Sequence, residues 1–135
     1  MLKSLFFVLI IFFIITKNIN ANEIKSLSEL KENNSSDNYS QILMERCAAI
    51  YAALSILENN NEYENRYKIF LQSSILEILN KNNNLKEEII YKESIDDFKI
   101  SLSFLLQILK QNYKINNSFL KNHWIEKDFN TCKKL

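Results

Sequence analysis

The chain of 135 residues contains no glycine and no proline. These two residue types usually end helices and form turns, so another residue type must separate the secondary-structure elements. Asparagine is the candidate, because its clusters lie between apolar segments, at 33–34, 59–61, 82–84 and 116–117. Asparagine tolerates the left-handed conformation just past a helix end, and its side chain caps helix starts. The sequence therefore predicts helices separated by asparagine turns.

Apolar residues recur at helical spacing in four segments, at 37–58, 62–80, 94–113 and 117–133. A short helix over 85–91 would either continue into the third segment or break before it, because Ser94 followed by Asp97 is typical of a helix start. No segment shows sustained alternation of apolar and polar residues, so nothing indicates a sheet. Helices joined by short turns pack antiparallel to their sequence neighbours. We therefore predict an all-α domain over 37–135, an up-down four-helix bundle.

The N-terminus has the pattern of a secretory signal peptide over residues 1–21. Lys3 supplies the positive charge, an apolar run follows over 5–15, and Ala21 offers a cleavage point. The alternative, an uncleaved anchor, fits less well because about 20 apolar residues are needed to span a bilayer. Residues 22–36 are polar and are expected to form a flexible leader with at most a weak helical turn or two. The sequence thus predicts a periplasmic or secreted protein that meets a membrane only through the signal segment before cleavage.

The charge balance excludes the usual electrostatic partners. The formal net charge is +1, and removal of Lys3 and Lys17 from the 17 basic residues leaves 15 against 16 acidic residues, a net charge of −1. A nearly neutral chain without a basic block has no electrostatic reason to bind nucleic acid or anionic lipid headgroups. We expect neither as a partner.

The two cysteines, Cys47 and Cys132, allow one intramolecular disulfide. An exported chain enters an oxidising compartment, where thiols form disulfides by default. In a four-helix ring the first and last helices are neighbours, so the predicted topology permits this bridge. It would close a loop from residue 47 to residue 132, for which chain entropy predicts about 4 to 5 kcal/mol of stabilisation.

Around Cys47 lie nearly all the alanines of the chain. Ala48 and Ala52 form one ridge of small side chains four residues apart, and Ala49 and Ala53 form a second. Small ridges let a neighbouring backbone approach closely, which a disulfide also requires. We interpret the segment as a close packing strip; the alternative is that the alanines leave room for a ligand.

Arg46 is one of only two arginines and lies on a helix that is otherwise nearly all apolar. A planar guanidinium suits a fixed carboxylate partner, and Asp128 is a candidate because it shares a face of the last helix with Cys132. A structural ion pair between Arg46 and Asp128 and an Arg46 that simply reaches solvent both remain open.

No residue pattern supports catalysis or metal binding. The single histidine, His123, has no second metal ligand at the required spacing apart from Glu126, and it is not on the face of Cys132. Redox catalysis requires a closely spaced cysteine pair, which is absent. Met44 and His123 resemble, in layout only, the haem ligands of periplasmic four-helix cytochromes. We therefore expect no enzyme, no metal and no cofactor, with a haem-like site between Met44 and His123 as the alternative.

The segments "RCAAIYAAL" (46–54) and "HWIEKDFNTCKKL" (123–135), behind a signal peptide, resemble those of small exported helical proteins with one cysteine near each end, known from AT-rich marine bacteria. The resemblance implies an exported protein with one disulfide, and no transferable activity. The expected function is a non-catalytic helper or binding module that presents a helix face to a protein or a small apolar ligand. The alternative is a periplasmic cofactor or ligand carrier. An exposed apolar patch would favour a protein partner, and an enclosed apolar cavity a ligand.

Overall fold

A computed structural model describes residues 25–33, 36–82, 84 and 86–135 of the chain. The predicted signal peptide, residues 1–21, lies outside the described residues. Within them the secondary structure is entirely helical, and the helices are α2 (Leu27–Asn33), α3 (Ser36–Glu58), α4 (Asn61–Lys81), α5 (Glu87–Asn116) and α6 (Trp124–Cys132). The prediction of an all-α helical bundle is confirmed.

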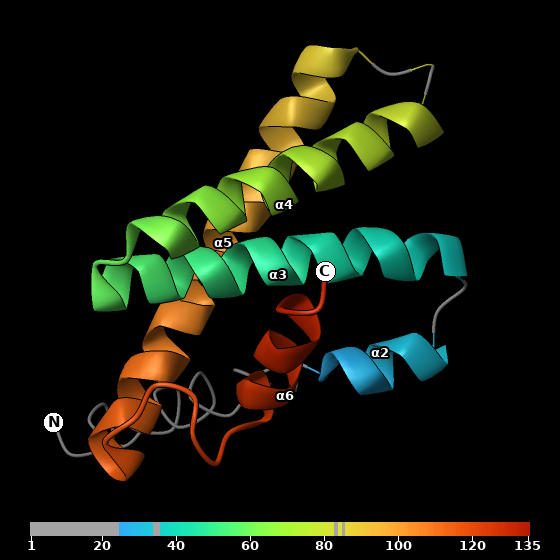
Figure 1. Cartoon of the computed structure of the whole chain (residues 1–135). Helices are drawn as coiled ribbons and strands as arrows, with labels where there is room; N and C mark the ends of the chain where they lie inside the picture. Colours follow the sequence, from blue (N-terminus) through green and yellow to red (C-terminus); the bar gives the residue numbers. More distant parts are fainter. Residues whose placement is uncertain (1–24, 34–35, 83, 85) are drawn as a thin grey trace, which may run out of the picture.

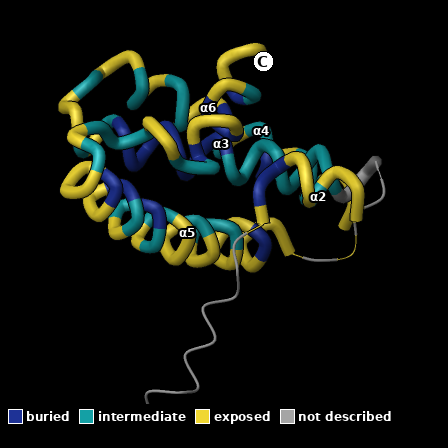
Figure 2. The backbone as a smooth tube through the Cα atoms, turned by 90° about the horizontal axis from the view of Figure 1, so that it is seen from below, coloured by how far each residue is buried: buried dark blue, intermediate teal, exposed yellow. Residues whose placement is uncertain are grey.

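Helix α3 is the centre of the bundle. Figure 1 shows α4 alongside it, α5 crossing both at a steep angle, and α2 and α6 on the side of α3 away from α4. Every residue from Cys47 to Leu54 is buried, which agrees with the expectation that a helix apolar on nearly all faces has neighbours on several sides. Figure 2 shows the same distribution, with buried positions concentrated in α3 and along one side of α5.

The apolar composition of α3 is also compatible, by length and hydropathy, with a membrane-spanning helix. Among the described residues, Tyr39–Glu58 is the one stretch long and apolar enough to cross a membrane by length and composition. The same stretch supplies most of the buried core. A central core helix needs apolar side chains all round, so packing explains this composition.

Asparagine terminates helices as predicted. Asn59, Asn117 and Asn122 have positive φ angles of 50°, 50° and 61°. Asn60 caps the start of α4, where its Oδ1 accepts a hydrogen bond from the Glu62 N–H at 2.9 Å. Asn82 ends α4, and its N–H donates to carbonyl oxygens of the last turn. The residue type thus performs both tasks usually shared between glycine and serine.

The helix boundaries can be compared with those expected from the sequence. Helix α5 begins at Glu87 and continues through Ser94, so the structure has the first of the two alternatives, in which the short helix over 85–91 continues into the third segment. Helix α6 begins only at Trp124 and not at 117, because Asn117 and Asn122 both have positive φ and the chain turns between them. Within the segment 22–36, for which the sequence allowed a helical turn or two, Leu27–Asn33 forms α2; the burial of Leu27 in the core was not predicted.

Candidate functional site

Cys47 on α3 and Cys132 on α6 form the predicted disulfide. The two sulfurs are 2.04 Å apart and the two Cα atoms 5.5 Å apart, and both residues are fully buried. The bond therefore joins the central helix to the last one, with a sequence separation of 85 residues. Its presence points to an oxidising compartment.

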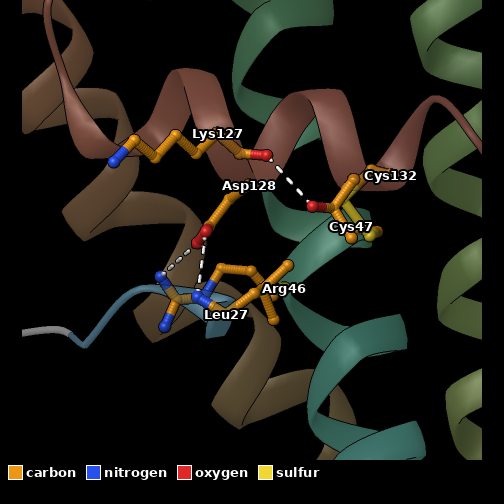
Figure 3. The surroundings of a disulfide bond; sticks show 7 residues. Leu27, Arg46, Cys47, Lys127, Asp128 and Cys132 are labelled. Atoms are coloured by element: carbon orange, nitrogen blue, oxygen red, sulfur yellow. Dashed lines mark hydrogen bonds and ion pairs between the residues drawn. A yellow bond between two sulfur atoms is a disulfide. The ribbon is translucent and has the colours of Figure 1, made fainter. Parts of the chain in front are cut away.

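Beside the disulfide the structure brings Arg46 and Asp128 together. Nη1 of Arg46 lies 3.5 Å from Oδ2 of Asp128, and Figure 3 shows both side chains next to the bridge. Oδ1 of Asp128 accepts a hydrogen bond of 2.9 Å from the backbone N–H of Leu27. Nη2 of Arg46 donates to the carbonyl oxygen of Lys25 at 3.2 Å. The pair thus holds the start of α2 against α3 and α6.

Burial dominates the electrostatics of this pair. Loss of solvent raises the pKa of the Asp128 carboxyl, and the Leu27 N–H and Arg46 only partly oppose that rise. Loss of solvent also lowers the pKa of Arg46, against the effect of Asp128. The guanidinium gains a further contact from the Trp124 ring, whose centroid lies 5.2 Å from the guanidinium carbon. These contacts hold the guanidinium and the carboxylate together beside the disulfide.

The four alanines of the predicted packing strip, Ala48, Ala49, Ala52 and Ala53, are all buried. They lie on the segment of α3 that carries Cys47 and supplies much of the core cluster. Ala52 also lines a surface groove between α3, α4 and α5. The segment therefore sits where helices meet, and one of its small side chains borders a hollow.

The structure gives His123 and Met44 different contacts. His123 is the N-cap of α6, and its Nδ1 accepts the Ile125 N–H at 3.3 Å. Burial lowers the pKa of His123. Met44 packs against the core cluster from α3. Within the described part of the chain, no three His, Cys, Asp or Glu side chains come together as metal ligands.

Asn112 has a structural role that sequence reasoning missed. It is buried in α5, and its Nδ2 donates to the carbonyl oxygens of Ser118, Phe119 and Lys121 at 2.9 to 3.1 Å. The side chain therefore holds the turn before α6 against the end of α5. A sequence signal exists, since Asn112 is a polar residue three positions after the core residue Leu109 on the same face of α5.

Two open grooves border α5. The first has a volume of about 350 Å³ and lies between three helices; it is lined by Ala52, Ser55, Ile56, Asn59, Glu64, Tyr67, Phe98 and Leu102. The second has a volume of about 490 Å³ and follows α5 alone; it is lined by Lys99, Leu102, Ser103, Leu106, Gln107 and Lys110. Leu102 belongs to both, so the two grooves adjoin. Both are open to solvent and differ from an enclosed ligand cavity.

The groove between three helices has a mixed lining of polar and apolar side chains. Ile56 projects from α3 with 58% of its surface exposed. The Tyr67 and Phe98 rings are stacked with centroids 6.0 Å apart. Nothing in the sequence indicated this groove, because its lining residues come from three helices and are far apart along the chain.

Comparison with known proteins gives no further assignment. The chain matches no protein-family model, and no curated protein or solved structure is similar enough to count as a match.

Proposed function

We propose that this protein is a non-catalytic binding module of an oxidising compartment, periplasmic or extracellular, that presents one side of α5 to a protein partner. The proposal rests on the adjoining grooves that share Leu102. They are open to solvent and have apolar side chains in their lining, and such surfaces accept a helix or loop of another protein more readily than they enclose a small molecule.

The core provides the rigid support that such a surface requires. Leu105 and Leu109 anchor α5 in the core cluster, while Leu102 and Leu106 on the adjacent side remain only half-buried. The disulfide holds α6 on α3, and neither cysteine nor any residue of α6 lines a groove, so stabilisation and recognition fall on different side chains. This separation supports a binding module in which the disulfide stabilises the fold and takes no part in binding the partner.

A photo-crosslinking residue at position 56 tests the proposal. Ile56 lines the groove and is 58% exposed, whereas Ile69 on α4 is 59% exposed and lines neither groove, so position 69 is a matched control. The two oxidised proteins are irradiated in extract from cells that produce the chain. We expect a discrete protein adduct from position 56 and none from position 69.

Equal adducts from both positions, or no protein adduct from position 56, contradict a docking face at the groove. Native mass spectrometry of the protein purified without denaturant provides the second readout. A bound apolar small molecule or a haem would contradict a protein-binding module and favour a ligand or cofactor carrier.

A further inference from the structure

The side of α5 that borders the grooves has a definite charge pattern. From Phe98 to its end at Asn116, α5 carries three lysines and no carboxylate. Lys99 and Lys110 line the groove on either side of the apolar pair Leu102 and Leu106. The distance from position 99 to position 110 along a helix is about 16 Å, or three turns. The surface is therefore an apolar strip with a cation at each end.

These lysines are available for a partner. Lys99 has one ion pair, a 3.5 Å contact with Asp96 in which both side chains are more than half exposed, and such pairs contribute little. No carboxylate among the described residues pairs with Lys110. The one carboxylate that lines the grooves, Glu64, lies near the Asn59 end and is already paired with Lys68 at 2.7 Å.

We infer that the grooves along α5 accept an amphipathic helix of a partner protein whose apolar stripe is flanked by carboxylates about three turns apart. This inference rests on the proposed function and names the chemistry of the partner. Leucine-sized side chains would fill the two hollows at Leu102, and the carboxylates would meet Lys99 and Lys110. Complementary charges of this kind select the partner and its orientation more than they add affinity.

A second copy of this chain is a poor occupant of the same face. In a symmetric pair of α5 helices, an antiparallel arrangement places Lys99 opposite Lys110 of the other copy, and a parallel arrangement places each lysine opposite itself. Both arrangements bring like charges together around a small apolar contact. The same surface that attracts an acidic helix therefore opposes self-association.

Two designed peptides test the inference with the oxidised full chain. Both are helical peptides of about 18 residues with leucines at spacings of three and four, and the flanking positions are Glu in one peptide and Lys in the other. We expect the acidic peptide to bind more tightly than the basic one by about tenfold or more at low salt, with the difference reduced in 0.5 M salt. The double variant Lys99→Glu/Lys110→Glu should reverse the preference.

The matched control is Lys121→Glu/Lys134→Glu, which changes the net charge equally at two exposed lysines outside α5. It should keep the preference for the acidic peptide. Circular dichroism of both double variants excludes loss of fold as the cause, since all four lysines are exposed.

The outcomes separate the partner chemistry from the docking face. Equal binding of both peptides that is lost in Ile56→Asp overturns the acidic partner and leaves the groove as the docking face. If neither peptide binds, the inference of an acidic helix as partner is overturned, whether or not position 56 crosslinks a protein. Dimerisation in analytical ultracentrifugation that Lys99→Glu/Lys110→Glu alters would identify a second copy as the occupant and overturn the inference as well.

Discussion

Two side chains near and within α6 each accept a hydrogen bond from one backbone N–H. Asp128 accepts the Leu27 N–H, and His123 accepts the Ile125 N–H, so one carboxylate docks α2 and one imidazole caps α6. Both acceptors are partly or fully removed from solvent, where an unpaired N–H is costly. Each therefore allows a prediction at the level of one residue.

Asp128→Ala should destabilise the protein by about 2 to 3 kcal/mol, because it leaves the buried Arg46 charge and the Leu27 N–H without their partner. Urea unfolding of the oxidised protein measures the change. Asp96→Ala, which removes the exposed partner of Lys99, is the control and should cost less than about 0.5 kcal/mol. Similar losses in both variants would show that the pair beside the disulfide contributes no more than a surface pair.

The stability of the fold should fall as the pH drops below the ordinary histidine pKa of 6.5, because burial lowers the pKa of His123. The unfolded chain then takes up the proton first, and protonation at Nδ1 also removes the acceptor of the Ile125 N–H. Above that pH both states are neutral and the contribution is fully present. His123→Asn retains a capping oxygen and does not titrate, so the difference between the two proteins in unfolding free energy should change between pH 8 and pH 5. A constant difference would rule out this linkage.

At the scale of elements, helix ends depend on asparagine. Asn117 ends α5 with a φ of 50°, and its N–H donates to the Tyr113 carbonyl oxygen at 2.9 Å. A side chain with Cβ and no local polar group adopts this conformation at a cost of about 1 kcal/mol or more. Asn117→Ala should therefore lower the unfolding free energy by about 1 kcal/mol, while Asn117→Gly should leave it unchanged or slightly higher.

Thermal and urea unfolding of these variants provide the measurement. Asn130→Ala, a change of the same kind on the exposed side of α6, is the control and should be neutral or slightly stabilising, since alanine has the higher helix propensity. A loss at position 130 equal to that at position 117 would contradict the backbone explanation.

The helices also show which features of the fold can be predicted from the sequence. The periodicity of α3 and α4 gave their limits closely, because each is bounded by asparagines and faces the core along its length. The start of α5 stayed open in the sequence, since Ser94 and Asp97 fit a helix start and fit the interior of a longer helix equally well. The docking of Leu27 was missed because one buried leucine in a polar segment depends on Asp128, which is 101 residues away. The grooves were missed for a similar reason, since they arise from the crossing of helices.

For the whole molecule, the disulfide is the strongest single constraint. Reduction of Cys47–Cys132 should lower the unfolding free energy by about 4 to 5 kcal/mol, because it releases a closed loop with a sequence separation of 85 residues. Urea unfolding with and without a dithiol reductant measures this loss. The double variant Cys47→Ala/Cys132→Ala is the control and should respond to urea identically with and without reductant. An unchanged midpoint for the oxidised and reduced chain would show that packing alone holds α6.

The contact between Leu27 and Asp128 also sets an order of assembly. A ribosome makes Leu27 early, yet the carboxylate that secures it is added 101 residues later. The start of the described fold therefore lacks this contact until Asp128 in α6, the last described helix, has been synthesised. The docking of α2 is thus a late step in folding, although α2 is the first of the described helices to be made.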